Sequence, residues 1–356
     1  MSSAAKILVC YNEPAKVYNN YIGKSTLSDE ENVDLSETGM TSHINDIVSG
    51  LGLYFKNVET YAFSSDVERA ISFITSYGPD VIFNFVESVE GRANYEAYTA
   101  GLYELLGVNY TGNIPLCLGL CLNKARTKQL LQSGNIKTPG YFIAKYNSKF
   151  NSVIDPESFN LKFPVILKLL NEDASIGISE FSVVSSMEEV NRRLAFLFKT
   201  YRQDVIIEEF INGREFNVSI LGGEVLPVSE IIFSGLPKGL PKIVTYEGKW
   251  SPNSTYYKYT NPNCPADIDE ELRLRIETAA RGAYEIMNCR DYARIDIRLS
   301  RSGVPYVIEV NPNPDLSQDA GFARASRVKG LSYPEMLYSI VSLALERKEH
   351  DTKTIA

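Results

Sequence analysis

The sequence predicts an α/β protein with a parallel sheet near its N-terminus and α+β character further along. In the first third, short apolar runs alternate with stretches of helical periodicity. Strands separated by helices favour parallel pairing with right-handed crossovers. In the last third, two apolar runs meet at Gly222-Gly223, which is typical of an antiparallel hairpin. The length of 356 residues suggests two or three domains at about 150 residues each.

The elements expected in the first third follow from this pattern. Strands are expected at 6–11, 58–64 and 79–86, and helices at 40–55, about 66–77 and 94–107. Ligands of parallel sheets bind beyond the carboxyl ends of the strands. This rule places four residues at a candidate site, with simple solvation of the loop carboxylates as the alternative: Asn12, Glu13, Glu87 and Glu90.

Strands and helices are also expected along the rest of the chain. The middle third is predicted to contain a helix from 123 to Gly134, a strand after Pro139, strands at 163–170 and 205–211, a small-residue loop at 171–179 and a helix at 186–201. A hairpin-like pair over 215–233 is followed by a helix at 267–288, strands at 294–300 and 305–311, and a terminal helix near 334–347. Residues 234–265 hold five prolines and show no clear element, which is typical of a functional lid or of disorder.

Composition argues against several classes of protein. The net charge of −8 opposes nonspecific nucleic-acid binding, which rests on a basic surface, but it allows a local basic pocket for a small polyphosphate. No apolar run of about 18 residues exists for a transmembrane helix, and the first apolar segment reads as a strand rather than a signal peptide. The five cysteines are odd in number and scattered, so a reduced, cytoplasmic protein is expected.

Two familiar catalytic motifs do not fit this sequence. There are only two histidines, His43 and His350, which argues against a histidine-based triad or a histidine-rich metal site. The tetrapeptide 23–26 (GKST) resembles the end of a P-loop. The glycine that a P-loop needs five residues before it is Tyr18 here, so the match fails.

Two segments have the chemistry of a nucleotide site. Lys168 lies in an apolar strand, where an ammonium group needs an anionic partner, and the small-residue loop 174–177 lets backbone N–H groups approach phosphate oxygens. In the run 208–216, carboxylates alternate with apolar residues, so acceptors can reach an adenine amine and ribose hydroxyls. The alternatives are a snorkelling lysine with an ordinary turn, and an edge strand that displays glutamates.

Two further segments suggest a metal site. Asp296 and Glu309 lie in two apolar strands joined by a short turn, so their carboxylates can converge on one face. Together with the amide oxygen of Asn311 they form a set of hard oxygen ligands suited to Mg²⁺. A buried ion pair with Arg294 is the alternative.

In their order along the chain, these segments resemble the ATP-grasp superfamily and, within it, the D-alanine–D-alanine ligase group. The most specific parts are GVNYTGN (107–113), NKARTK (123–128), EEFINGREF (208–216), ARIDIR (293–298) and VIEVNPNP (307–314). The resemblance implies an ATP-grasp fold in three parts: an N-terminal α/β preATP-grasp domain with a parallel sheet (1–122), a central ATP-binding subdomain (123–211) and a C-terminal subdomain (212–356) with a lid at 234–265.

The resemblance also implies a role for each matching residue. Nucleotide-binding roles are implied for Lys124 and Lys168 at the ATP phosphates, for Ser175, Ile176 and Gly177 in the loop that covers them, and for Glu208, Glu209, Ile211 and Glu215 at the adenine and ribose. Asp296, Glu309 and Asn311 would ligate two Mg²⁺ ions, for which Mn²⁺ can substitute. Catalytic roles are implied for Lys249 at the γ-phosphate and Arg294 at the tetrahedral intermediate, and less directly for Glu13, because the family has a Gly/Ser-rich loop there.

The implied reaction joins a small-molecule carboxylate to an amine through an acyl phosphate, with release of ADP and phosphate. The lid would exclude water, because an acyl phosphate hydrolyses readily. The resemblance further implies a homodimer, with neither nucleic acid nor a membrane as a partner.

The positions that bind substrate in the family differ in this chain. Ala174 replaces one hydroxyl of the phosphate loop, Trp250 replaces the tyrosine after the lid lysine, Asp315 replaces a glycine, and Ala320 replaces the serine that binds the second D-alanine. These changes predict a different substrate pair. Asp315 is expected to be a specificity residue, with a side chain that points to solvent or caps a following helix as the alternative. A cell-wall D-alanine–D-alanine ligase and a non-catalytic ATP-binding protein are the alternatives, and the intact catalytic and metal-binding motifs argue against the second.

Overall fold

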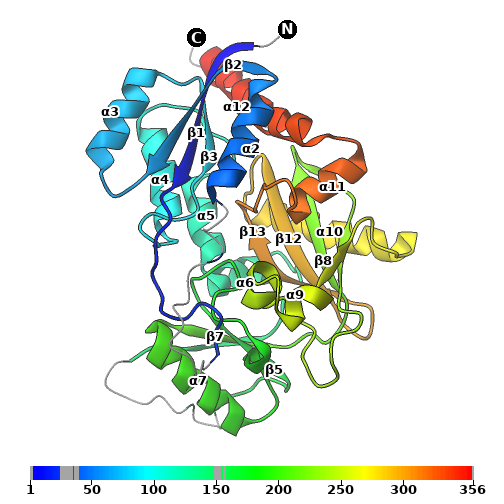
Figure 1. The fold of residues 1–356 in the computed structure, drawn as a ribbon. Coiled ribbons are helices and arrows are strands. Elements are labelled where there is room, and N and C mark those ends of the chain that lie inside the picture. Colours follow the sequence, from blue (N-terminus) through cyan, green and yellow to red (C-terminus); the bar gives the residue numbers. More distant parts are fainter. Residues whose placement is uncertain (1–2, 25–34, 36–39, 148–153, 155–157, 355–356) are drawn as a thin grey trace.

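The structure is a computed structural model, which describes residues 3–24, 35, 40–147, 154 and 158–354. Its strands form three sheets: a parallel sheet at the end of the molecule where both chain ends lie, and two antiparallel sheets beyond it (Figure 1). The prediction of an α/β N-terminal part followed by α+β parts is therefore confirmed.

The N-terminal sheet is parallel, in the strand order β2-β1-β3. Its strands are β1 (Ser3–Asn12), β2 (Phe55–Phe63) and β3 (Val81–Phe85). Alternate side chains of β1 enter two different cores, because helices cover both faces. One face packs against α2 (Met40–Gly52) and α12 (Tyr333–Thr354), and the other against α3 (Val67–Tyr77) and α4 (Tyr95–Leu105).

Helix α12 brings the end of the chain back to its beginning. Its buried residues Met336, Leu337 and Ile340 lie in the same core as Ile7 and Val9 of β1. The division predicted from the sequence assigns this helix to the C-terminal subdomain, whereas its apolar face completes the N-terminal core.

The central sheet has the order β4-β7-β5-β6. Its strands are β4 (Tyr141–Ala144), β5 (Val165–Leu169), β6 (Val183–Val184) and β7 (Val205–Glu209). Helix α7 (Met187–Tyr201) covers the face to which Val165, Leu167 and Leu169 of β5 point. Because side chains alternate along a strand, Lys168 points to the opposite face.

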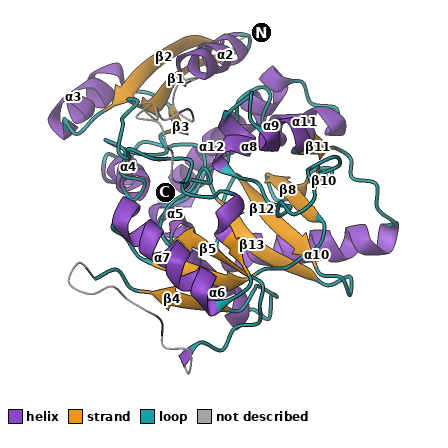
Figure 2. Ribbon diagram, turned by 60° about the horizontal axis from the view of Figure 1, so that its bottom comes forward, coloured by secondary structure: helices purple, strands orange, loops and turns teal. Residues whose placement is uncertain are grey.

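The C-terminal sheet has the order β11-β10-β8-β12-β13, and β9 pairs with β8. Its strands are β8 (Glu215–Leu221), β9 (Glu224–Val225), β10 (Ser229–Ile232), β11 (Asn261–Asn263), β12 (Tyr292–Leu299) and β13 (Pro305–Asn311). Helices α5 (Pro115–Leu122), α6 (Lys124–Ser133) and α10 (Glu270–Ile286) share its core (Figure 2). Gly222 and Gly223 have φ of 59° and 81° and join β8 to β9, which confirms the predicted hairpin.

The prediction that residues 234–265 lack regular structure is wrong. The segment contains α8 (Tyr246–Trp250), α9 (Thr255–Tyr259) and β11. Both helices begin at a side-chain cap, because the hydroxyls of Thr245 and Ser254 accept backbone hydrogen bonds. Helices of five residues are too short to show a period of 3.6, which is why the pattern did not reveal them.

Two longer helices also lie outside the sequence prediction, namely α5 and α11 (Gly321–Lys329). Helix α5 is apolar on all sides and therefore lacks an amphipathic period. None of the described helices has both the length and the apolar character needed to span a membrane.

Candidate active site

A cavity of about 750 Å³ lies between the central and C-terminal sheets. Its volume is within the range of roughly 300–1,000 Å³ that is typical of small-molecule sites. The predicted residues that line it are Lys124, Lys168, Ser175, Ile176, Glu208, Glu209, Ile211, Glu215, Lys249, Trp250, Arg294, Asp296, Glu309, Asp315 and Ala320. Segments that are far apart in the sequence therefore supply one continuous site.

Three of the residues to which the family resemblance gives a nucleotide-binding, metal-binding or catalytic role do not line this cavity. Asn311 lines a second cavity of about 170 Å³, and Lys249 and Arg294 belong to the walls of both cavities. Gly177 is buried within its loop. Glu13 is exposed, lines neither cavity, and donates its backbone N–H to a carbonyl of β2. The structure does not bring Glu13 to the site, because the chain is still paired with β2 at this residue.

The carboxylate of Glu208 lies between two lysines at one end of the large cavity. Its Oε2 lies 3.0 Å from Nζ of Lys168, and its Oε1 lies 3.3 Å from Nζ of Lys128. Burial alone would raise the pKa of Glu208, but the two ammonium groups lower it below its usual value. Oε1 accepts no hydrogen bond from the described residues, so it can still accept one from a ligand.

Lys128 is a residue of this cluster that sequence reasoning missed. It is buried, and its ammonium group also donates to the Thr138 hydroxyl at 3.1 Å. Burial lowers the pKa of Lys128 to about 8, although Glu208 opposes this change. Its spacing four residues after Lys124 was the available signal, because residues i and i+4 share one face of a helix.

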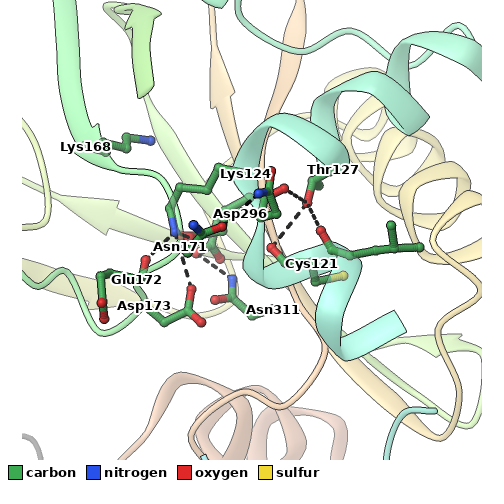
Figure 3. Close-up of polar contacts among 12 residues, drawn as sticks. Cys121, Lys124, Thr127, Lys168, Asn171, Glu172, Asp173, Asp296 and Asn311 are labelled. Carbon is green, nitrogen blue, oxygen red and sulfur yellow. Dashed lines mark hydrogen bonds and ion pairs between the residues drawn. The ribbon is translucent and has the colours of Figure 1, made fainter. Parts of the chain in front are cut away.

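Lys124 occupies the first position of α6, in contact with two carboxylates (Figure 3). Its Nζ lies 3.2 Å from Oε1 of Glu309 and 3.4 Å from Oδ1 of Asp173, and it also donates to the Glu172 carbonyl. Burial would lower the pKa of this lysine, but these carboxylates raise it above its usual value. Lys124 is therefore held as a cation at the point where the sheets meet.

Asp296 and Glu309 occupy directly opposed positions in the pairing of β12 with β13, so their predicted convergence is confirmed. The carboxylate of Asp296 accepts from Arg294 at 2.8 and 2.9 Å and from the Asn311 side-chain amide at 3.1 Å. The ion pair between Asp296 and Arg294, which the sequence offered as the alternative to a metal site, is thus also present. Burial would raise the pKa of Glu309, but Lys124, Lys168 and Lys249 lower it to about 2.

The loop 174–177 and helix α8 form one side of the large cavity. Ala174 and Ser175 have φ of 53° and 61°, a left-handed conformation that is strained for residues other than glycine. The Trp250 indole N–H donates to the Ala174 carbonyl at 3.1 Å, which holds α8 on this loop. Lys249 is next to Trp250, and burial together with Arg294 lowers its pKa below the usual value.

Asp315 and Ala320 lie where β13 leads into α11. Asp315 lines both cavities, and its Oδ1 accepts from the Ser317 N–H at 2.8 Å, which closes a local turn before α11 and does not cap that helix. Ala320 is the N-cap residue of α11 and offers no side-chain hydrogen bond. Arg324, one turn into α11, also lines the large cavity and was not predicted.

Four residues were expected at the edge of the parallel sheet, and of these only Glu87 lines a cavity. It lines the second cavity, and its N–H donates to Oδ1 of the buried Asn12 at 3.2 Å. Glu90 is exposed in a tight turn with φ of 51°, in agreement with simple solvation.

Residues 17–24, which we name the strap, connect the N-terminal sheet to the loop 174–177 and α8 (Figure 1). The Gly177 N–H donates to the Tyr21 carbonyl at 2.8 Å. The ring of Tyr21 stacks on that of Tyr246 at 5.9 Å, and Nζ of Lys24 lies 2.5 Å from the Glu247 carboxylate. Gly23 and Lys24, the described residues of the tetrapeptide that resembles the end of a P-loop, therefore contact Ser179 and helix α8.

Two comparisons of sequence point to one family. Residues 130–342 match the family model described as the D-ala D-ala ligase C-terminus. The chain is 31% identical to the D-alanine–D-alanine ligase of Nitrosospira multiformis over 259 residues, 72% of this chain and 78% of that ligase. It is also 30% identical over 269 residues to the uncharacterised protein y4sG of Sinorhizobium fredii, which covers 75% of each chain.

Solved structures share the fold. The D-alanine–D-alanine ligase of Bacillus anthracis complexed with ATP has a TM-score of 0.73 at 21% identity, and the match covers 98% of this chain and 100% of that one. The VanG D-Ala:D-Ser ligase of Enterococcus faecalis has a TM-score of 0.65 at 21% identity, over 96% and 100%. The predicted ATP-grasp fold is confirmed by these matches.

Proposed function

The chain belongs to the D-alanine–D-alanine ligase family, whose members are ATP-dependent ATP-grasp enzymes that form an amide bond, and from this premise we propose that it joins a small-molecule carboxylate to an amine other than D-alanine. The observation that carries the proposal is the pair of cavities that share part of their walls. Lys249 and Arg294 line both, so the phosphates of ATP in the large cavity would face a carboxylate in the small one.

The reaction needs ATP because a carboxylate is a poor electrophile toward an amine. Transfer of the γ-phosphoryl group to the carboxylate forms an acyl phosphate and ADP. Attack by the amine nitrogen then forms the amide, and phosphate leaves. The protein contributes positioning and electrostatic stabilisation of the phosphoryl charge, so no side-chain nucleophile is required.

The nucleotide is held mainly by strands β5, β7 and β8 in this proposal. Oε1 of Glu208 accepts a hydrogen bond from the adenine amine, and the backbone of Glu209 and Ile211 flanks the base. Glu215 holds the ribose, with its carboxylate oriented by Arg298 at 2.9 Å. Lys124 and Lys168 contact the phosphates, under the backbone of Ser175, Ile176 and Gly177.

The residues around Asp296 fit Mg²⁺ when phosphate oxygens complete its coordination. Among the described residues, no group of three or more histidine, cysteine or carboxylate side chains is arranged to hold a metal by itself. Asp296, Glu309 and Asn311 offer two carboxylates and an amide, and Mg²⁺ commonly keeps such a small protein set together with waters and substrate phosphates. The ionised state of Glu309 supports this role. Two Mg²⁺ ions, or Mn²⁺, would neutralise charge on the phosphoryl group.

We extend the proposal to the lid and the catalytic residues. Residues 234–265 close over the nucleotide and carry Lys249 to the γ-phosphate, which excludes water from the acyl phosphate. Arg294 stabilises the tetrahedral intermediate. Since Glu13 is exposed and lies away from both cavities, we assign it no part in the reaction.

We infer that the acceptor differs from D-alanine, because the carboxylate of D-alanine would lie beside Ala320 and Asp315, which replace the family's serine and glycine. Ala320 has no hydroxyl to donate, and Asp315 adds a negative charge beside it. Loss of one hydrogen bond to a charged group costs about 1.5–3 kcal/mol. The enzyme is proposed to act in the cytoplasm, consistent with five free cysteines among the described residues, and as a homodimer, which light scattering on the purified protein would test.

The test is a coupled assay of ADP release over pairs of carboxylates and amines, including amino acids of both chiralities. We expect ADP release that depends on both members of a pair. D-Alanine alone supporting the fastest turnover would identify a D-alanine–D-alanine ligase instead, and tight ATP binding without turnover for any pair would identify a non-catalytic ATP-binding protein.

A further inference from the structure

The second cavity has acidic residues on the part of its wall that the large cavity does not share. This part of the wall includes Glu87, Ser88 and Glu96, which line the second cavity but not the large one. Glu96 is only 9% exposed, and its Oε1 accepts from the Asn313 side-chain amide at 2.9 Å. Ser88 is equally buried, and its hydroxyl has no hydrogen-bond partner among the described residues. A buried hydroxyl without a partner usually marks the place of a ligand or a water molecule.

The end of this cavity that adjoins the large cavity carries two cationic side chains. The described residues that line this cavity include one lysine, Lys249, and one arginine, Arg294. Both also line the large cavity. The phosphoryl group is transferred at this end in the proposed reaction. The donor carboxylate therefore binds between Lys249 and Arg294, and the rest of the donor extends toward Glu96.

The position of the acids distinguishes two kinds of positive charge on a donor. The α-ammonium group of an amino acid is two bonds from its carboxylate carbon, so it stays near the shared part of the wall, where Asp173 and Asp315 lie. Glu87 and Glu96 lie beyond this region, on the unshared part. A donor that pairs with them would carry a second positive charge further from its carboxylate.

No lysine or arginine among the described residues forms an ion pair with the buried Glu96, and burial of an unpaired carboxylate is costly. Desolvation raises its pKa well above the usual range, and nearby carboxylates add to the effect, although the hydrogen bond from Asn313 opposes it. A buried carboxyl group is most stable as a carboxylate when a cation pairs with it. An ammonium or guanidinium group in the cavity would supply that partner.

The backbone holds these acidic residues in place. The loop after β3 closes in a tight turn at Glu90 and Gly91, whose φ values are 51° and 67°. A side chain at Gly91 would overlap the Val17 methyl group of the strap, at 1.6 Å from an added Cβ. The loop that carries Glu87 and Ser88 is therefore packed against the strap.

We propose that the second cavity binds the carboxylate donor and that this donor is an amino acid with a cationic side chain, whose charge pairs with Glu96 and whose polar hydrogens reach the Ser88 hydroxyl. This inference rests on the proposed ligase function. It goes beyond it by naming the class of donor.

The test uses hydroxylamine in place of the unknown acceptor. Its nitrogen attacks the acyl carbon of the acyl phosphate, the bond from that carbon to the phosphate oxygen breaks, and a hydroxamate and phosphate form. Lysine and norleucine, each in both chiral forms, are compared as donors, because norleucine has the same chain without the terminal amine. We expect kcat/KM for lysine to exceed that for norleucine by about 10- to 150-fold, the value of a hydrogen bond between charged groups. Equal values, or a preference for norleucine, would overturn the proposal.

The variant Glu96→Gln tests the assigned residue. Glutamine keeps the acceptor for Asn313 but removes the charge, so the ratio of kcat/KM between lysine and norleucine should fall toward one. Glu104→Gln is the matched control, because Glu104 lies on the same helix and lines neither cavity, and it should leave the ratio unchanged. An undiminished ratio in Glu96→Gln would contradict the role of Glu96.

Calorimetry separates this inference from the proposed function. Lysine and norleucine are titrated into the protein with Mg²⁺ and a non-hydrolysable ATP analogue. Tighter binding of lysine without any hydroxamate formation would support the donor pocket and count against the ligase reaction. Hydroxamate formation with neutral donors only would support the ligase reaction and overturn the donor class.

Discussion

At the scale of single residues, Glu309 is a proposed magnesium ligand, a role that requires its carboxyl group to be ionised. Three lysines keep this partly exposed carboxyl group ionised. Glu309→Gln removes the charge but little volume, so we expect the fold to persist and turnover to fall at least about 100-fold, because metal ions contribute several kcal/mol of transition-state stabilisation. ADP release and thermal unfolding are the measurements. Turnover equal to that of the unmodified protein would exclude Glu309 as a ligand.

The same residue predicts how stability depends on pH. The pKa of Glu309 is about 2 in the folded protein, against 4.5 as the ordinary value, so its contribution of about 3 kcal/mol is complete above pH 4.5 and is lost as the pH falls through 2. Between pH 6 and pH 3 the loss is about 2 kcal/mol. In urea unfolding, the free energy of unfolding of Glu309→Gln should therefore fall by about 2 kcal/mol less between pH 6 and pH 3 than that of the unmodified protein. An identical loss in both proteins would contradict the assigned ionisation.

Acceptor choice is a second property of single residues. Replacing Asp315 with Gly and Ala320 with Ser removes a negative charge and restores a hydroxyl at the start of α11. We expect the use of D-alanine as acceptor to rise about 10-fold or more in the ADP-release assay. Gln318→Ser, an exposed change in the same turn, should have no effect. A double variant no better than the original chain with D-alanine would show that the acceptor is chosen elsewhere.

Residue motifs predicted much of the site, and their failures have a common cause. Asp296 and Glu309 could be paired from the sequence, because a short turn between two strands leaves little freedom in register. The role of Lys128 depends on contacts between α6 and β7, which are distant in the sequence. The position of Glu13 depends on where β1 ends, and strand ends are set by pairing rather than by local pattern.

At the scale of elements, the strap holds helix α8 against the phosphate loop. Lys24 pairs with Glu247 on α8 at 2.5 Å and with Glu180 at 3.6 Å. Lys24→Met should weaken the hold on Lys249 and lower kcat about fivefold, from a loss of about 1 kcal/mol in a partly exposed pair. Lys16→Met, an exposed change just before the strap, is the control. Steady-state kinetics at saturating ATP measure kcat for both variants. Equal kcat values for Lys24→Met and Lys16→Met would show that the strap does not influence the lid.

The segment 234–265 shows what element prediction lacks. Its prolines and short helices give no period, yet Thr245 and Ser254 each cap a helix. The Tyr246 N–H then donates to the Ile178 carbonyl at 3.1 Å, so a tertiary contact fixes α8 in place. Longer elements such as α7 and α10 were predicted because their apolar faces repeat over several turns.

At the scale of the whole molecule, the ends of the chain fold together. The parallel sheet predicted from the first third has one face covered by α12, from the last third, and no local pattern reports that pairing. The ATP-grasp order of motifs did predict the overall architecture, because it specifies which parts follow one another.

The packing of α12 makes a prediction about the N-terminal sheet. Leu337 is fully buried in the core that contains Ile7 and Val9. Leu337→Ala should lower the free energy of unfolding by about 2–5 kcal/mol, from lost burial and the cavity left behind. Because this core lies under β1 and β3, hydrogen exchange should accelerate there, although those strands are more than two hundred residues away in the sequence. Ser339→Ala, on the exposed side of the same helix, should change neither quantity. Faster exchange confined to α12 itself would mean that the helix can detach without loosening the sheet, and that the N-terminal core is complete without it.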